Sequence, residues 1–257
     1  MRIRFLGSGT SQGVPMIGCD CEVCRSPDPR NKRYRPSVMV ETGQAHMVVD
    51  TTPDFRSQCL ANNVRRLDAI LVTHPHADHV LGLDDVRRFC ANGRVLPVYA
   101  AREHLQVLRR IFAHAFDAAS RLPGWPQVDG HVVEPLRPFQ VGATRVTALE
   151  LPHGRTTVLG YLFENAAGRF AYLTDCKSVP PAAIERLRGV NVLALDALRH
   201  RPHFGHLTVS EALAVVGEIK PERAYFTHIC HDLDHATLES QLPPHVRVAY
   251  DGLVVDL

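Results

Sequence analysis

The sequence has no apolar run long enough to cross a membrane, and its first ten residues, MRIRFLGSGT, pass directly into a strand-like pattern and a glycine turn. A transmembrane helix needs about 20 mainly apolar residues, and a secretory signal needs a shorter apolar stretch near the N-terminus. The sequence shows neither pattern. We therefore expect a cytoplasmic protein that does not interact with membranes.

An excess of charge of one sign is also missing, because 29 Lys and Arg residues nearly balance 27 Asp and Glu residues. The net charge is +2, and no dense basic face has the interleaved aromatic residues of a typical nucleic-acid surface. This composition disfavours a dedicated polynucleotide-binding protein without excluding one. A small-molecule partner is the better expectation.

A disulfide framework is equally unexpected, because the chain has seven cysteines, an odd number, at scattered spacing. Reduced or metal-bound thiols fit this pattern better. The sequence also has no internal repeat, no low-complexity tract and no convincing linker, and 45% of its residues are hydrophobic. Residues 1–257 are therefore predicted to form one domain with a full core.

Short β-rich runs alternate with helical patterns, which predicts an α/β protein with a mixed sheet. The β-rich runs cover residues 2–7, 46–52, 69–74, 97–100, 144–153, 158–165, 169–175, 190–198, 224–229 and 246–257. The helical patterns cover residues 54–63, 83–91, 102–119, 180–188 and 208–219. Thr208 or Ser210 is suited to cap the last helix, and Glu211 completes a capping-box spacing with Thr208. Residues 120–138, rich in Pro and Gly, are predicted to form a loop that borders the cleft or an interface.

The segment HPHADH at residues 74–79 concentrates four groups that bind metals or move protons. It lies between an apolar, strand-like run and a helical pattern, which predicts a strand-to-helix turn. In an extended segment, side chains two positions apart point to the same side, so His74 and His76 can converge on one ion while the turn redirects Asp78 and His79. This geometry suits two metals side by side. The alternative is a polar turn whose histidines only hydrogen-bond to their neighbours.

Three further candidate ligands, His153, Asp175 and His228, stand at the ends of strand-like runs. Each of them alone is compatible with a capping or turn residue. Together with the first segment, they supply enough imidazole and carboxylate groups to fill two metal sites and to leave a position for solvent.

The His-x-His-x-Asp-His segment, followed in order by these three residues, resembles the metallo-β-lactamase superfamily. The resemblance implies an αββα sandwich of two mixed β-sheets flanked by helices, with the metals at one edge of the sheets. The ligands that it implies are His74, His76 and His153 for the first metal, Asp78, His79 and His228 for the second, and Asp175 as a bridge. Asp50 resembles the family's aspartate that orients a ligand imidazole, and a simple turn residue is the alternative.

The segment GCDCEVC sets Cys19, Cys21 and Cys24 in one tight loop, at a spacing typical of metal ligands. His231 is the best candidate for a fourth ligand, because a turn after the strand can direct it away from the ligand His228. Three reduced cysteines in a surface loop are the alternative. This pattern, with the opening stretch GSGTSQGVPMIGCDCEVC, is similar to the PhnP-type phosphodiesterases of the superfamily, and we expect a structural zinc there. The remaining cysteines are interpreted as ordinary small core or strand-end residues: Cys59, Cys90, Cys176 and Cys230.

Two metals would lower the pKa of a bound water and polarise a phosphoryl or acyl oxygen, which is hydrolase chemistry. Zn or Mn ions are expected in the binuclear site, and Fe and Ni also suit imidazole and carboxylate ligands. The resemblance to PhnP-type enzymes implies a small cyclic or sugar-phosphate diester as the substrate, such as a ribosyl 1,2-cyclic phosphate. A homodimer is compatible with the sequence, which sets no oligomeric state.

The leaving group of a phosphodiester needs a proton, and His206, just before the helix at 208–219, is the expected general acid. His203 is its nearest competitor. The alternative for His206 is a surface histidine at a helix N-terminus, and Asp78 or a water on the second metal then becomes the proton donor. Arg155 and Thr156 are expected to contact a phosphate oxygen.

Three other functions are kept as alternatives. An RNA-processing nuclease similar to tRNase Z has a long tRNA-gripping arm between the residues that match His153 and Asp175, but only 21 positions separate them here. A thioester hydrolase similar to glyoxalase II would act on thioesters and not on bis-(p-nitrophenyl) phosphate. A metal-binding protein without catalysis would close the coordination sphere of its ions.

Overall fold

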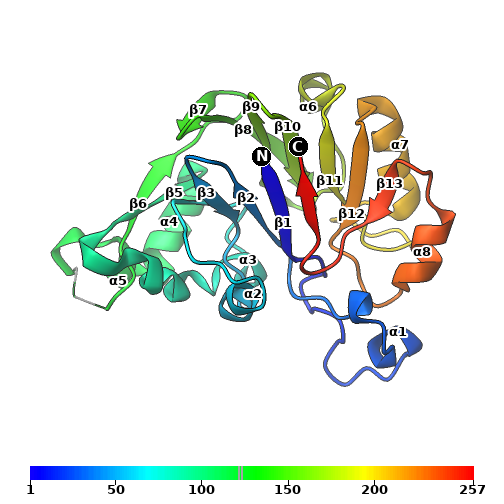
Figure 1. The fold of residues 1–257 in the computed structure, drawn as a ribbon, viewed down its shortest axis with the longest axis horizontal. Helices are drawn as coiled ribbons and strands as arrows, with labels where there is room; N and C mark the ends of the chain where they lie inside the picture. Colours follow the sequence, from blue (N-terminus) through cyan, green and yellow to red (C-terminus); the bar gives the residue numbers. More distant parts are fainter. Residues whose placement is uncertain (121, 123) are drawn as a thin grey trace.

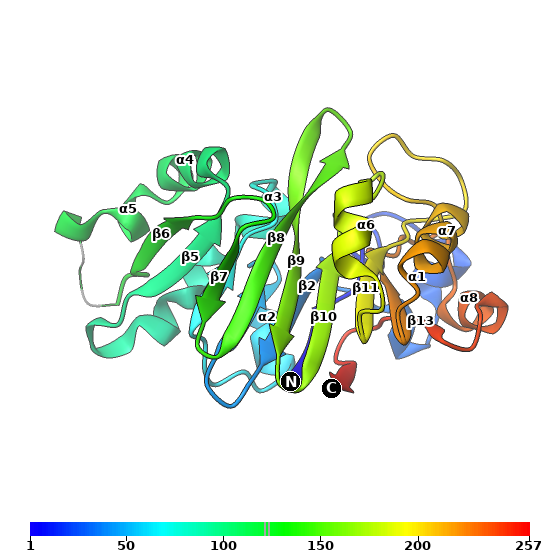
Figure 2. The same cartoon turned by 90° about the horizontal axis from the view of Figure 1, so that it is seen from above.

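The computed structural model describes residues 1–120, 122 and 124–257, and its two β-sheets pack face to face (Figure 1). Helices cover the outer face of each sheet, which gives the layer order helix, sheet, sheet, helix (Figure 2). This arrangement confirms the expected αββα sandwich of two mixed β-sheets flanked by helices. The two termini lie side by side, because the first and last strands pair.

The first sheet has the strand order β14, β1, β2, β3, β4, β5, β6. The strand bounds are β1 (Arg2–Gly7), β2 (Ser37–Glu41), β3 (His46–Val49), β4 (Ala69–Leu71), β5 (Leu96–Ala100), β6 (Val128–Val132) and β14 (Val254–Asp256). Pairing is antiparallel from β14 to β3 and parallel from β3 to β6. The carboxyl ends of β3 and β4 therefore lie at the same edge of this sheet.

The second sheet has the strand order β13, β12, β11, β10, β9, β8, β7. The strand bounds are β7 (Pro138–Val141), β8 (Thr144–His153), β9 (Thr156–Asn165), β10 (Gly168–Leu173), β11 (Val192–Asp196), β12 (Arg223–Thr227) and β13 (Val246–Val248). Strands β10 to β13 are parallel, whereas β8, β9 and β10 alternate in direction. Strand β8 thus runs the same way as β10, and the ends of β8, β10, β11 and β12 share one edge.

The helices form the two outer layers. Their bounds are α1 (Glu22–Arg25), α2 (Phe55–Ala61), α3 (Ala77–Val80), α4 (Arg102–Ile111), α5 (Ala113–Phe116), α6 (Pro181–Leu187), α7 (Val209–Ile219) and α8 (His235–Gln241), with 3₁₀ segments η1 (Pro29–Asn31), η2 (Leu83–Gly93) and η3 (Ala118–Ser120). Apolar side chains of α2, η2, α4 and α5 pack against the first sheet, and those of α6, α7 and α8 pack against the second. The expected capping box of α7 is present, because Thr208 and Glu211 bond each other's backbone N–H groups.

The space between the sheets is filled by side chains that alternate along each strand. On β8, Val146 belongs to the core between the sheets, whereas Leu149 packs under the helices, as the two-residue period of a strand requires. The Tyr161 hydroxyl of the second sheet donates to the Val72 carbonyl of the first at 2.8 Å. This bond and the apolar core fix the position of the two sheets relative to each other.

Two predicted helices differ from the structure. The helix predicted at 102–119 breaks at Phe112 (φ −114°, ψ 41°), because this ring is buried and the chain leaves helical geometry there. The segment predicted at 83–91 is the 3₁₀ segment η2, which is interrupted at Ala91 and Asn92. Asn92 has a φ of 61°, a left-handed conformation that an α-helix does not accommodate.

Two predicted strand and loop assignments also need correction. Residues 120–138 contain strand β6 and the first residue of β7, so they are not one loop, and positions 121 and 123 lie outside the described residues. The run at 246–257 divides into β13 and β14, which belong to different sheets. The turn between them is fixed by Asp251, which accepts a hydrogen bond from the Ser8 N–H at 2.9 Å, and by Gly252 with a φ of 87°. Strand β2 and helix α8 have no counterpart among the predicted elements.

Within the described part of the chain, no helix has the length and apolarity needed to cross a membrane.

Candidate metal centres and active site

Strand ends from both sheets bring the candidate ligands to one edge of the sandwich. On the first sheet, Asp50 follows β3, and the turn after β4 carries His74 into α3. The ends of β8, β10, β11 and β12 on the second sheet carry His153, Asp175, Asp196 and His228. Residues far apart in the sequence therefore become neighbours at this edge.

The first group consists of His74, His76 and His153, whose candidate ligand nitrogens lie within 4.8 Å of one another. His74 Nε2 is 2.8 Å from His76 Nδ1, and His153 Nδ1 donates to the Gly205 carbonyl at 2.9 Å, which leaves His153 Nε2 for a ligand. Burial holds the pKa of His74 well below its usual range and also lowers the pKa of His153. These conditions favour the neutral imidazole, the form that binds metals.

The second group consists of Asp78, His79, Asp175 and His228, also with donor atoms within 4.8 Å. One Asp175 oxygen is 3.4 Å from His79 Nε2, and the other is 3.2 Å from His228 Nε2. Burial alone would raise the pKa of Asp175, but the two imidazoles hold it well below its usual range. Burial alone would lower the pKa of His79, but the nearby carboxylates of Asp175 and Asp50 hold it well above its usual range. Positive charge is therefore favoured at this point.

Two buried ring nitrogens show whether the two ligand groups are suited to bind metal ions. His79 Nε2 and His228 Nε2 have no hydrogen-bond partner among the residues that the structure describes, although buried polar atoms are normally paired. Both nitrogens face the Asp175 carboxylate, which also lies within 4.8 Å of a His153 nitrogen. A carboxylate between two sets of imidazoles fits a pair of divalent cations.

Asp50 is fully buried, and its carboxylate orients one candidate ligand. It accepts hydrogen bonds from the Thr73 N–H at 2.8 Å, the Thr73 hydroxyl at 2.8 Å and His79 Nδ1 at 2.7 Å. The last bond leaves His79 Nε2 directed at Asp175. Of the two roles considered for Asp50, this geometry matches the aspartate that orients an imidazole.

His206 is buried beside both groups. Its exposed fraction is 8%, so it is not the surface histidine of the alternative interpretation. Its Nδ1 donates to Asp196 Oδ2 at 2.7 Å, and its ring stacks on His228 with centroids 4.6 Å apart. His203, the competitor, is more exposed and accepts a hydrogen bond from the Gly205 N–H at 3.1 Å. The structure therefore brings His206 to the site with a carboxylate partner.

Asp196 is a site residue that the sequence analysis missed. It follows the apolar run VLAL at the end of β11, just as Asp175 follows β10. It is fully buried, and its Oδ2 also accepts a hydrogen bond from the Cys176 N–H at 2.9 Å. The same strand-end signal that selected Asp175 was available for Asp196, but no motif drew attention to it.

A cleft of about 880 Å³ lies in front of the first group. Its lining includes His76 and His153 together with the predicted substrate contacts Arg155 and Thr156. Phe204, which the sequence analysis did not select, also lines the cleft with 77% of its surface exposed. An exposed aromatic ring at a cleft provides a surface on which a substrate ring can pack.

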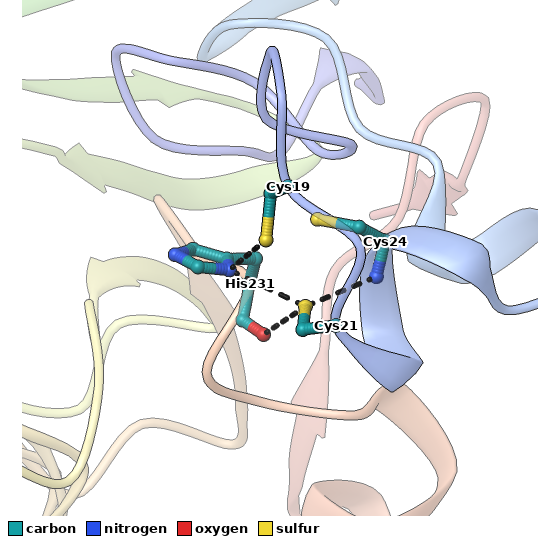
Figure 3. A group of neighbouring side chains, drawn as sticks. All are labelled: Cys19, Cys21, Cys24 and His231. Atoms are coloured by element: carbon teal, nitrogen blue, oxygen red, sulfur yellow. Dashed lines mark hydrogen bonds between the residues drawn. The ribbon is translucent and has the colours of Figure 1, made fainter.

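A second candidate metal centre lies away from the cleft, where Cys19, Cys21, Cys24 and His231 converge (Figure 3). His231 Nδ1 is 3.4 Å from both Cys19 Sγ and Cys21 Sγ. A tetrahedral zinc with Zn–S of about 2.3 Å and Zn–N of about 2.0–2.1 Å separates sulfur and nitrogen by roughly 3.5 Å. The donor set and its spacing therefore fit a zinc ion with a closed coordination sphere.

The thiols of this cluster differ in how readily they ionise. Hydrogen bonds from the Cys24 N–H and from His231 lower the pKa of Cys21 to about 6. Burial raises the pKa of Cys24 to about 11. A cation in the cluster would favour the thiolate of Cys24. As expected, the other cysteines lie in or beside the core: Cys90, Cys176 and Cys230 are buried and Cys59 is half-buried.

A family model described as the beta-lactamase superfamily domain matches residues 46–229. The crystal structure of a diphosphatase from the PhnP family superposes with a TM-score of 0.91 at 42% sequence identity, and the match covers 100% of this chain and 97% of that chain. Zinc-bound PqqB from Methylobacterium extorquens superposes with a TM-score of 0.82 over 100% of both chains. The identity to PqqB is 22%, so this likeness concerns the fold alone.

The octanoyltransferase of Porphyromonas gingivalis strain W83 is 40% identical over 259 residues. The match covers 98% of this chain and 51% of that protein, so the chain spans about half the length of this curated relative. The activity in that name is that of the whole protein, of which this chain matches about half.

Replacing Cys21 by Ser should remove one zinc equivalent per chain and lower the thermal stability, because three donors hold zinc less tightly than four. A loss on the order of 3 kcal/mol lowers Tm by about 6–12 °C in a chain of this size. Zinc analysis and calorimetry measure both effects, and Cys59→Ser, outside the cluster, is the matched control. Catalysis should persist in the protein that stays folded. Lost turnover at unchanged Tm would instead make this centre catalytic.

Proposed function

Because the chain belongs to the metallo-β-lactamase superfamily and is a metal-dependent hydrolase, we propose that it cleaves a small phosphodiester of the cyclic or sugar-phosphate type. A ribosyl 1,2-cyclic phosphate is a substrate of this kind. The similarity to a PhnP-family diphosphatase supports phosphoryl chemistry. The observation that carries the proposal is the buried pair of His206 and Asp196, which provides a proton donor beside both ligand groups.

The binuclear centre is built from the two ligand groups. Its ligands would be His74, His76 and His153 for one cation, Asp78, His79 and His228 for the other, and Asp175 for both. When bound, two divalent cations such as Zn or Mn, with Fe and Ni also suited to these ligands, polarise a phosphoryl oxygen and acidify a water molecule. The protein fixes the ligand rings, because the Gly205 carbonyl holds His153 and the Asp50 carboxylate holds His79.

His206 supplies the proton for the departing oxygen. Hydrolysis of the diester breaks one P–O bond, adds water to phosphorus and releases an alcohol, so the leaving alkoxide must gain a proton. Asp196 accepts the Nδ1–H of His206 at 2.7 Å, which fixes the orientation of the ring. The proton then leaves from Nε2, the ring nitrogen that Asp196 does not engage. Asp78 is the reserve donor if His206 only positions substrate.

The cleft favours a small substrate. Arg155 and Thr156 stand at the start of β9 on its lining, where a guanidinium and a hydroxyl can bind phosphate oxygens. Between His153 and Asp175 the chain forms a tight turn and the strands β9 and β10, so no tRNA-gripping arm is inserted there. This arrangement disfavours the RNA-processing alternative.

A diphosphate bond is the second candidate target, because the PhnP-family structure is that of a diphosphatase. Its leaving group is a phosphate, which departs with far less need of a proton than an alkoxide does. The two candidates therefore differ in how strongly they depend on His206.

A substrate panel tests the proposal. The metal-loaded protein should hydrolyse bis-(p-nitrophenyl) phosphate and a ribosyl 1,2-cyclic phosphate. The kcat/KM values for these two substrates should exceed those for a glutathione thioester and a precursor tRNA by about 100-fold or more. A diphosphate ester completes the panel, and cleavage of this ester alone would select the second candidate. Activity confined to the thioester or to RNA, or the absence of any turnover with metals bound, would contradict the proposal.

Replacing His206 by Ala should lower kcat by about 10²–10⁴ on diesters with alkoxide leaving groups and much less on p-nitrophenyl esters, because p-nitrophenolate leaves without a proton. Steady-state kinetics on the two substrate types measure the difference, and metal analysis should show unchanged content. His203→Ala is the matched control, since this neighbouring ring has no carboxylate partner within the described structure and both rates should stay near wild type. Equal losses on both substrates would make His206 a positioning residue.

A further inference from the structure

A second cavity, separate from the cleft, lies between α2 and η2 on the outside of the first sheet. Its volume is about 630 Å³, within the range of small-molecule pockets. It shares no lining residue with the cleft or with either ligand group. The basic residues that line it are Arg56, Arg65, Arg66, Arg87, Arg88 and Arg94.

These six arginines are poorly neutralised. Asp85 also lines the cavity, Asp68 pairs with two of the arginines and Asp84 pairs with Arg87. Six guanidinium groups therefore face three carboxylates, an excess of three positive charges in a chain whose net charge is +2. Arg56 and Arg88 have no hydrogen-bond or ion-pair partner in the described part of the chain. Such planar, unpaired donors are suited to bind phosphate groups in a bidentate manner.

The cavity also has an apolar wall. Val64 and Phe89 are half-buried, and Leu60 is 65% exposed. A bare anion such as inorganic phosphate would leave this wall in contact with water. A ligand that carries a ring beside its phosphates would cover the wall and engage the arginines at once.

We propose that this cavity binds a nucleotide with several phosphates, with the phosphates on the arginines and the base against Leu60 and Phe89. The volume of about 630 Å³ favours a small ligand over a polynucleotide, which would need an extended basic surface. The site does not depend on the function proposed for the cleft, because none of its residues belongs to the metal centres.

Calorimetric titration of the metal-loaded protein with the β,γ-imido analogue of ATP tests this site, since the analogue resists hydrolysis. One analogue per chain should bind saturably. Arg56→Glu and Arg88→Glu should each raise Kd by about tenfold or more, because each removes a charge-assisted contact to phosphate and adds repulsion. Both side chains are exposed, so the variants should keep the wild-type Tm. Arg155→Ala, in the cleft, should bind like the wild type.

Two controls and one competing ligand, a single-stranded RNA, decide the outcome. Arg110→Glu, an exposed α4 residue with the same charge change outside the cavity, should leave Kd within about twofold of wild type. Inorganic triphosphate should bind more weakly than the analogue, because it lacks the base. The proposal would be overturned if the analogue did not bind saturably, or if Arg110→Glu and Arg88→Glu lost the same affinity for it. It would also be overturned if triphosphate bound as tightly as the analogue, or if a single-stranded RNA bound more tightly than the analogue in an arginine-dependent manner.

Discussion

A buried carboxylate between two imidazoles is the constraint on which the rest of the structure depends. Asp175 is 3% exposed, and its oxygens face His79 at 3.4 Å and His228 at 3.2 Å. Burial of a charged carboxylate is costly unless partners of opposite charge surround it. His79 lies in α3, which follows β4 of the first sheet, and His228 directly follows β12 of the second, so this requirement fixes how the two sheets meet at their edge.

The turn after β12 serves both candidate centres. His228 belongs to the ligand group that includes His79 and Asp175, whereas His231, three residues later, joins the cysteine cluster. The N-terminal loop is attached to the same turn, because the Thr10 N–H donates to the Ile229 carbonyl at 3.2 Å. A zinc held by Cys19 and its partners would therefore stabilise the turn that positions His228, which gives the second centre a structural role close to the first.

Much of the site follows from the sequence, because ligand spacing and strand ends are local features. The two-residue spacing predicted that His74 and His76 converge, whereas the addition of His153 to the same ion and the αββα sandwich were implied by the resemblance to the superfamily. Features that depend on distant packing were missed: Asp196 gains its role only by meeting His206, and arginines scattered from 56 to 94 gather only when η2 folds against α2. The break at Phe112 has the same cause, since tertiary burial of the ring overrides the helical pattern.

Metal content measured together with activity tests the central claim most directly. The protein as purified should contain three divalent ions per chain, one of them a zinc that resists mild chelation, because its four protein donors leave no open position. Chelation should remove the other two ions and the proposed phosphodiesterase activity together, and Zn or Mn should restore both. A content of one ion per chain, or full activity after the two exchangeable ions are gone, would contradict the binuclear mechanism.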